Sequence, residues 1–389
     1  MLKQKQRVIP LLACVTLWLA SQSGYAVEVA VNTPGKLDIG GAIRAKYQYQ
    51  EFAQQDKSKL EFADSKLVIQ YTSPTWLGYA DYRCYRTDEL CDLSMLVDAW
   101  VGYQLDAQQQ VSIGMMPVPF GPSQYWGSTY YEGTAYNLGL EDTHNPGIKY
   151  QYKTEQNELS LGFYPQDGGN YIGQSNDASR FSANLAQADD FNTGTNIEEK
   201  NMLIGRVSHQ FSQTATLNHT LGASYWHSEL NNQRSGKTGQ RDVWSVYGSS
   251  NWKQWNTTLV AGQQRLNNKD RNMPTISTFG AFDYPYQIAN DYDFYSAELS
   301  YRFANDYGRL SNIKPYLNYS AMDKTKKGFA TSERLISGVG FNYGRMGIFA
   351  EYMLGKNDAM FGGDANSYAQ GDKDAKWEKL LYISIGYYF

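Results

Sequence analysis

The sequence lacks any long hydrophobic run beyond its first 26 residues. After Ala26 no stretch approaches the ~18 uninterrupted apolar residues that a membrane helix needs, which excludes a helical membrane protein. Histidine, with 4 residues, and cysteine, with 3, are scarce. No phosphate-cradling Gly-rich loop, nucleotide fingerprint or paired metal-ligand spacing occurs. We therefore expect no cofactor and no bound metal.

The charge balance argues against a nucleic-acid partner. Three of the 35 basic residues and no acidic residue lie in 1–26, which leaves 32 basic against 39 acidic side chains, a formal charge of −7. A protein that binds nucleic acid presents a basic patch or stripe, and this sequence contains none. We expect no nucleic-acid binding.

Residues 1–26 predict a cleaved secretory signal peptide. Basic side chains at positions 3–7 precede a largely apolar run and a small-residue cleavage site at Gly24-Tyr25-Ala26. Lipoprotein processing at Cys14 is an alternative, which the continuation of the apolar run past that residue disfavours. Residues 27–389 show no Pro/Ser-rich boundary, so we expect them to form one exported domain.

The rest of the chain is rich in aromatic residues, since it holds most of the 32 Tyr, 16 Phe and 9 Trp, and it is hydrophobic at alternate positions. The final residues alternate strictly, with Ile385, Tyr387 and Phe389 on one face and Ser384 on the other. An unpaired apolar edge invites aggregation, whereas a closed barrel pairs its last strand with its first. We interpret Tyr387 and Phe389 as an assembly signal for the barrel-assembly machinery.

Alternation along the chain predicts an all-β fold, a transmembrane antiparallel β-barrel of sixteen strands. Apolar residues such as Met95 and Val97 are assigned to the lipid face, and charged residues such as Asp98 to the lumen, because a Lys or Arg facing lipid at mid-membrane costs about 2–4 kcal/mol. The predicted strand centres are Ile43, Leu67, Tyr82, Val97, Ile113, Tyr150, Leu161, Val207, Ala223, Val246, Leu259, Ala297, Leu317, Val339, Ala350 and Ile385.

Connections between these segments alternate short and long, as periplasmic turns and outer loops do. The long ones are 122–145, 165–201, 267–291 and 355–377. Several segments lack a cleanly apolar face, so fourteen or eighteen strands stay open as alternatives. A periplasmic or secreted β-sandwich is a further alternative, although such a domain rarely reaches this length without a linker.

Sixteen alternating segments, a C-terminal Phe389, a long third outer loop and the run Gly114-Met115-Met116-Pro117-Val118-Pro119-Phe120-Gly121 resemble the Gram-negative outer-membrane porin family, in its general, carbohydrate or phosphate-selective forms. The resemblance implies a homotrimer in which the third loop folds into the pore and narrows it. Here that loop would be residues 122–145. A dense arginine ladder is absent from the sequence, which makes phosphate specificity doubtful.

The third loop combines rings and carboxylates without a Lys or Arg. Sugars stack on aromatic faces, so a carbohydrate-permeable channel is one interpretation, and the acidic groups would oppose anions. Packing of the rings against the barrel wall or a subunit is the other. The predicted constriction residues are Tyr125, Trp126, Tyr130, Tyr131, Glu132, Tyr136, Glu141 and Asp142.

Charged residues on the predicted inward faces form a candidate pore wall. Cations on the wall opposite an acidic loop would create a transverse field that favours small polar solutes. Each could also be a simply solvated side chain. The wall residues are Arg44, Lys46, Asp98, Lys149, Arg206, Glu298, Arg302, Lys314 and Glu351.

Cys84 and Cys91 flank six residues in an exported chain, so we predict a disulfide across a hairpin tip. Asp364, Asp372 and Asp374 do not match a calcium loop, and solvated loop carboxylates are commoner.

The sequence predicts a porin of the Gram-negative outer membrane, in contact with lipid and lipopolysaccharide, that passes ions and small polar solutes by passive diffusion. A receptor or adhesin with exposed loops is the main alternative. A hydrolase at the barrel rim is the weaker alternative, since none of the four histidines accompanies a nucleophile pattern.

Overall fold

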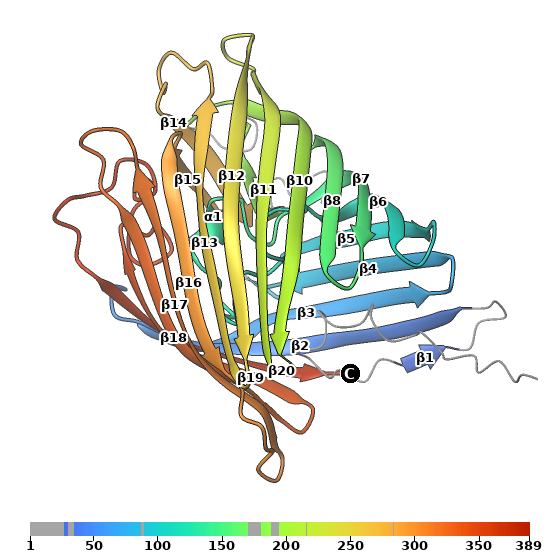
Figure 1. The fold of residues 1–389 in the computed structure, drawn as a ribbon. Helices are drawn as coiled ribbons and strands as arrows, with labels where there is room; N and C mark the ends of the chain where they lie inside the picture. The colour runs from blue at the N-terminus through green and yellow to red at the C-terminus, as the bar shows by residue number, and fades with distance from the viewer. Residues whose placement is uncertain are drawn as a thin grey trace, which may run out of the picture.

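The computed structural model describes residues 27–29, 35–86, 89–169, 180–187, 194–214, 216–282 and 284–389, so the predicted signal peptide lies outside the described residues. The chain forms a closed antiparallel barrel of sixteen strands (Figure 1), which confirms the predicted fold and strand number. Each predicted strand centre falls inside one barrel strand. A short strand β1 (Val27–Val29) pairs with β2 beside the ring.

The barrel strands follow one another around the ring in chain order. They are β2 (Lys36–Gln50), β3 (Ser58–Thr72), β4 (Trp76–Tyr85), β5 (Leu93–Gln104), β6 (Gln109–Pro117), β7 (His144–Lys153), β8 (Asn157–Gln166), β10 (Ile197–Thr214), β11 (Leu217–Asn232), β12 (Lys237–Trp252), β13 (Trp255–Asn267), β16 (Tyr292–Tyr301), β17 (Leu310–Lys324), β18 (Ser332–Tyr343), β19 (Met346–Lys356) and β20 (Glu378–Tyr388).

Pairing of β20 with β2 closes the ring. The register runs from Ala42 opposite Tyr388 to Gln50 opposite Leu380. Beyond it, the amide of Phe389 donates to the carbonyl of Gly41 at 3.1 Å, and the amide of Gly41 donates back at 2.9 Å. The apolar C-terminal strand is therefore paired along both edges, as its alternation predicted.

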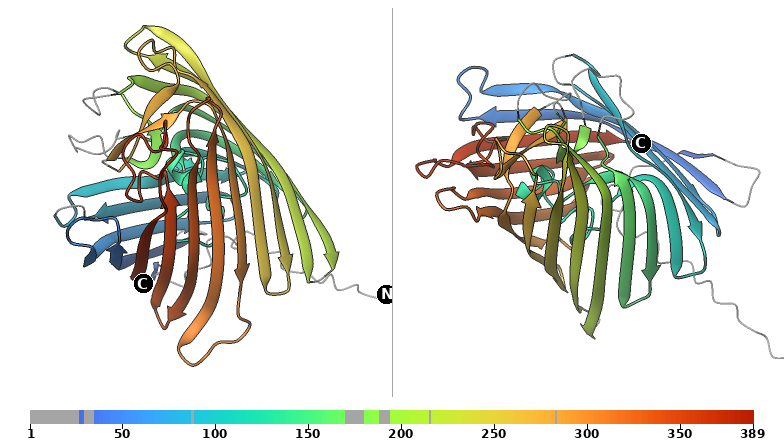
Figure 2. Two further views of the ribbon diagram at one scale, coloured as in Figure 1. Left: turned by 90° about the vertical axis from the view of Figure 1, so that its left-hand side faces the viewer. Right: turned by 90° about the horizontal axis from the view of Figure 1, so that it is seen from above.

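All long connections leave the same end of the barrel, which we call the loop end, and short turns join the strands at the opposite turn end. Four long connections are named L3 (118–143), L4 (167–196), L6 (268–291) and L8 (357–377). L3 folds into the barrel as predicted and carries a single helical turn, α1 (Thr134–Asn137), which lies inside the ring of strands (Figure 2).

Part of L4 and L6 forms regular structure that the alternation did not predict. Strand β9 (Arg180–Leu185) pairs with β14 (Ile276–Phe282), and β14 pairs with β15 (Tyr284–Ala289), which gives a separate three-stranded sheet. Phe279, Tyr286 and Ile288 are fully buried there. Helices of the length and hydropathy that crossing a membrane requires are absent from the described part of the chain.

The predicted faces hold over most of the barrel, but Met95 and Val97 were assigned to the wrong side. A register shift separates the pairs Asp81–Asp98 and Tyr82–Leu96, so β5 contains a bulge. A bulge adds one residue and reverses the alternation beyond it. Met95 and Val97 are consequently buried in a cluster with Phe181.

Glycines on the inward face make room for flat aromatic rings on the neighbouring strand. Gly222 lies opposite Tyr247, and a Cβ atom at Gly222 would stand 2.2 Å from that ring. Gly338 and Tyr316 repeat the arrangement on β18 and β17, with a separation of 2.5 Å. The rings can therefore lie flat on the inner wall only because the facing residue is glycine, since any larger side chain there would displace them.

We predict that Gly222→Ala lowers the free energy of unfolding by about 1–3 kcal/mol, because overpacking forces the Tyr247 ring out of its place. Urea unfolding of the protein in lipid vesicles, followed by tryptophan fluorescence, measures the change. Gly248→Ala is the control, since its Cβ would meet the exposed side chain of Leu221 at 3.2 Å and the carbonyl oxygen of Thr220 at 3.9 Å. Equal losses in both variants would contradict the packing argument.

Candidate functional site

L3 leaves β6 through a turn that only glycine fits. Gly121 has a φ of 71°, and a Cβ atom at this position would stand 2.3 Å from the indole nitrogen of Trp126. Its amide donates to Ser224 Oγ on β11 at 3.0 Å. The predicted Pro-Val-Pro-Phe-Gly run thus directs the loop across the inside of the barrel.

Two glutamates of the wall hold the backbone of L3. Both carboxylate oxygens of Glu298 lie 2.7 Å from the amide nitrogen of Ser128. Glu351 accepts from the amides of Tyr130 and Tyr131 at 2.7 and 3.0 Å. Both glutamates were predicted as pore-wall anions; they do face inward, but L3 covers them, and they are 3% and 0% exposed.

Two buried arginines on β12 and β18 complete the attachment of L3. Arg334 donates to the carbonyls of Glu132 and Gly133 at 3.1 Å and forms a bidentate pair with Asp358 of L8 at 2.8 and 3.0 Å. Arg241 donates to the carbonyl of Leu138 at 3.3 Å. The sequence analysis missed both arginines, although strand alternation places them on the inward faces.

The base of L3 is joined to β5 and L4 through His144. Its Nδ1 lies 2.8 Å from Asp98 and its Nε2 2.9 Å from Asp142, while its amide donates to Ser182 Oγ at 2.8 Å. Asp98 and Asp142, predicted to face the pore, therefore share one buried imidazole. No group of His, Cys, Asp and Glu suited to a metal ion occurs among the described residues.

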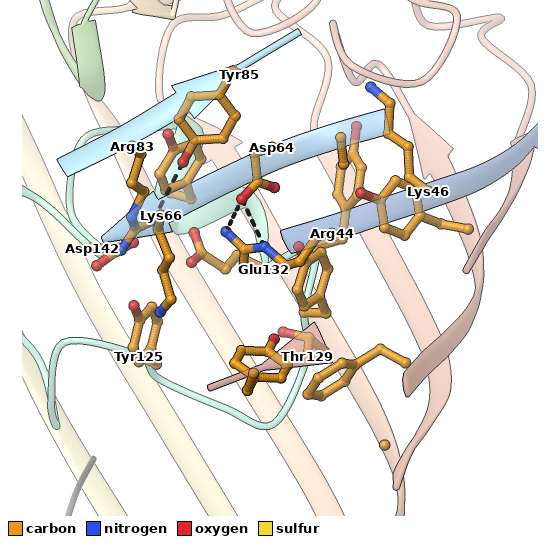
Figure 3. Close-up of a pocket in the computed structure, with 18 of the residues that line it drawn as sticks. Arg44, Lys46, Asp64, Lys66, Arg83, Tyr85, Tyr125, Thr129, Glu132 and Asp142 are labelled. Carbon is orange, nitrogen blue, oxygen red and sulfur yellow. Dashed lines mark hydrogen bonds and ion pairs between the residues drawn. The ribbon is translucent and has the colours of Figure 1, made fainter. Parts of the chain in front are cut away.

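A cavity of about 820 Å³ remains between L3 and the wall formed by β2, β3 and β4 (Figure 3). The wall side is basic, and the L3 side carries rings and two carboxylates. The charged and aromatic residues of these two sides that line it include Arg44, Lys46, Lys66, Arg83, Arg86, Tyr125, Tyr130, Tyr131, Glu132, Tyr136 and Asp142.

Carboxylates on the wall already pair with several of these cations. Arg44 Nε lies 2.8 Å from Asp64 (Figure 3), and Arg83 lies 2.8 Å from Asp81. Lys46 pairs with Glu61 at 3.1 Å. The forks of Arg44 and Arg83 are thus bonded within the wall itself.

Most predicted site residues lie at the cavity, and the others lie elsewhere for identifiable reasons. Trp126 belongs to L3 but its side chain is buried, and its backbone amide donates to the carboxylate of Glu141 at 2.6 Å. Lys149 donates to the carbonyl of Pro117 at 3.0 Å, and Arg206 pairs with Glu158. Arg302 and Lys314 do line the cavity.

The sequence analysis missed three basic residues of the cavity wall, Lys66, Arg83 and Arg86. Lys66 lies on the segment around Leu67, where neither face is cleanly apolar. Arg83 lies next to the point where the register with β5 shifts. Strand polarity carried a signal for Lys66, which alternates with the outward Leu67, and for Arg83, which alternates with the outward Tyr82.

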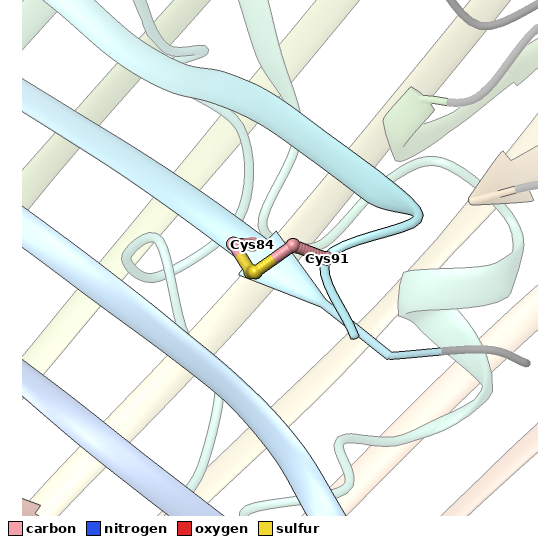
Figure 4. The surroundings of a disulfide bond; sticks show 2 residues. All are labelled: Cys84 and Cys91. Carbon is pink, nitrogen blue, oxygen red and sulfur yellow. A yellow bond between two sulfur atoms is a disulfide. The ribbon is translucent and has the colours of Figure 1, made fainter. Parts of the chain in front are cut away.

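Cys84 and Cys91 form the predicted disulfide between the end of β4 and the start of β5 (Figure 4). Their Cα atoms are 4.9 Å apart. Arg83 and Tyr85 flank Cys84 and both line the cavity. The crosslink therefore fixes the part of β4 that carries cavity residues.

Comparison with known proteins finds similarity in structure alone. No protein-family model and no curated sequence matches the chain. Similar solved structures include Salmonella typhi OmpF (TM-score 0.59, 13% identity, 93% of this chain and 100% of that chain), the anion-selective porin of Comamonas acidovorans (0.57, 13%, 91% and 100%) and the trimer form of Vibrio cholerae OmpT (0.55, 12%, 92% and 100%). The chain has the sixteen-stranded barrel fold of the Gram-negative outer-membrane porins.

We predict that Arg334→Met lowers the free energy of unfolding by about 3–5 kcal/mol, because Asp358 would remain buried without its partner. Urea unfolding in lipid vesicles measures the change. Lys356→Met is the control, since that ammonium lies 3.9 Å from Glu333 at a partly exposed site and should contribute at most about 1 kcal/mol. Similar losses in both variants would contradict this role of the buried Arg334–Asp358 pair.

The stability of the barrel should also depend on the protonation of Glu141. Burial raises the pKa of Glu141 to about 8, with Asp142 adding to the shift and the Trp126 amide opposing it. The folded state favours the protonated form, so this contribution to stability is present below pH ~4.5 and is lost as the pH rises through ~8. As the pH rises from 5 to 9, the urea midpoint of the wild type should therefore decrease relative to the midpoint of the Glu141→Gln variant.

Glu155→Gln is the control for this pH series, because Glu155 is exposed in a short turn. That variant should follow the wild type at every pH. A constant difference between the wild type and Glu141→Gln would contradict the assignment.

Proposed function

We propose that the chain is a porin of the Gram-negative outer membrane, through which ions and small polar solutes diffuse down their gradients. In this proposal residues 1–26 are removed on export and residues 27–389 form one barrel domain. The observation that carries it is a cavity lined by charged side chains inside a barrel whose outer surface is apolar. In a membrane barrel, an apolar outer face contacts lipid and a polar inner face contacts water.

The outer surface supports membrane insertion. Large aliphatic side chains are exposed around the ring, where a soluble protein rarely presents a continuous apolar band. Two belts of exposed rings flank them, as membrane barrels use at their interfaces. Members of the apolar band include Ile43, Val101, Ile113, Ile148, Leu161, Val207, Leu221, Val246, Leu259, Leu299 and Leu317. Rings near the turn end include Trp76, Tyr103, Trp252, Trp255, Phe303, Tyr343 and Tyr387, and those nearer the loop end include Tyr49, Tyr225, Trp244, Tyr295, Tyr319 and Tyr352.

Beyond the second belt, outward positions on the strands become charged. Asp242 bonds to His227 at 2.8 Å and to Tyr225 at 2.7 Å, and Asp293 accepts from Gln263 at 2.7 Å. This height suits lipid headgroups, so lipopolysaccharide is the proposed neighbour of the loop end. The loop end then faces outward, and the turn end faces the periplasm.

The proposed assembly is a homotrimer, in line with the trimer form of Vibrio cholerae OmpT. Exposed Tyr387 and Phe389 at the end of β20 are the proposed contact for the barrel-assembly machinery. The exposed apolar band would then be shared between subunit contacts and lipid.

The packing of the loops favours a channel over a receptor or a rim hydrolase. In L8, Tyr368 and Ala369 are fully buried, and the amide of Ala289 in β15 donates to the carbonyl of Tyr368 at 3.0 Å. These groups are unavailable to a partner outside the cell. His144 has both ring nitrogens bonded to carboxylates, so it cannot accept a proton from a nucleophile.

We predict that the purified mature protein conducts ions in a planar bilayer, with steps grouped in threes if it is trimeric. Thr129→Cys tests whether current passes the cavity, because Thr129 lines it (Figure 3) and both cysteines of the mature chain are bonded to each other. Sulfonatoethyl methanethiosulfonate should reduce the current of this variant stepwise.

Thr238→Cys, at an exposed position where β12 begins, is the matched control and should keep its full current with the reagent. A folded barrel without conductance would overturn the porin function. Equal sensitivity of both cysteine variants would place the current outside this cavity.

A further inference from the structure

Among the basic side chains of β2, β3 and β4 that line the cavity, Lys66 is the one that no carboxylate of the described residues pairs with. Arg44, Arg83 and Lys46 are paired with carboxylates. Lys66 lies on β3 between the two arginines, and across the described parts of the chain its ammonium has neither a hydrogen-bond nor an ion-pair partner. Figure 3 shows Lys66 extending toward Tyr125 of L3.

The opposite side of the cavity does not supply the missing negative charge. Asp142 is bonded to His144 at 2.9 Å and to Gln124 at 2.5 Å. Burial raises the pKa of Glu132 well above its usual value, and the neighbouring Asp142 and Glu141 raise it further, which favours the neutral form of that carboxyl. The acidic loop expected to oppose anions therefore presents mainly rings and hydroxyls.

The occupied arginine forks narrow the class of anion. A phosphate is bound best by free guanidinium forks that donate two parallel hydrogen bonds. The forks of Arg44 and Arg83 are already used by Asp64 and Asp81. A single ammonium beside aromatic faces instead matches a monovalent carboxylate with an apolar or aromatic body.

Building on the proposed channel function, we propose that the cavity is a binding site for small organic carboxylates, with the carboxylate on Lys66 and the body of the solute against Tyr125. The preference follows from which charges are left unpaired rather than from how many line the cavity. Arg302 and Lys314, which also line the cavity, add positive potential along the path.

Single-channel recording in a planar bilayer tests this site with three probes of similar shape: benzoate, neutral benzamide and cationic benzylammonium. The wild type should prefer chloride over potassium in a KCl gradient, and benzoate alone should interrupt the current. Lys66→Gln should raise the half-blocking benzoate concentration about tenfold or more, because a charge-assisted hydrogen bond is lost. Lys66→Arg should retain the block.

Lys59→Gln is the matched control, since it removes the same charge from an exposed position on the same strand, and its block should equal that of the wild type. A conducting channel that prefers cations, or a block unchanged in Lys66→Gln, overturns the carboxylate site while the porin function stands. A stronger block by inorganic phosphate than by benzoate also overturns it. A folded wild type without conductance removes the porin function itself.

Discussion

Every feature of the interior depends on the hydrogen bonds between β20 and β2. A barrel has an inside only when its first and last strands meet, and here that seam runs from Ala42–Tyr388 to Gln50–Leu380. It places Arg44 and Lys46 of β2 opposite Gly386 and Ser384 of β20. The seam thus builds the basic wall of the cavity as well as the closed ring, because the cavity lies along it.

A loop inside a barrel needs acceptors for its backbone amides and donors for its carbonyls, since unpaired buried groups are expensive. This chain supplies them from charged side chains of the wall, with Glu298 and Glu351 for amides and Arg334 for carbonyls. Inward charges in such a barrel therefore serve two separate purposes. Some hold the loop, and others remain open to the cavity.

The sequence was sufficient to predict the sixteen barrel strands, because lipid on one side enforces alternation along most of them, but it did not predict the three-stranded sheet of L4 and L6. It predicted L3 and the disulfide through the resemblance and the spacing of Cys84 and Cys91. It did not predict the bulge that turned Met95 and Val97 inward, since a bulge leaves no trace in the apolar pattern. It also could not separate Glu351 from Lys66, because both are inward charges and only the path of L3 decides which is covered.

The attachment of L3 has a consequence for the order of assembly. Tyr130 is bound by a carboxylate 221 positions later in the chain, and Gly133 by a guanidinium 201 positions later. An exported barrel folds after its synthesis is complete, so L3 takes its final place only once β18 and β19, which carry these two partners, have joined the wall. The narrowing of the lumen therefore follows the pairing of these strands, in whatever order the others assemble.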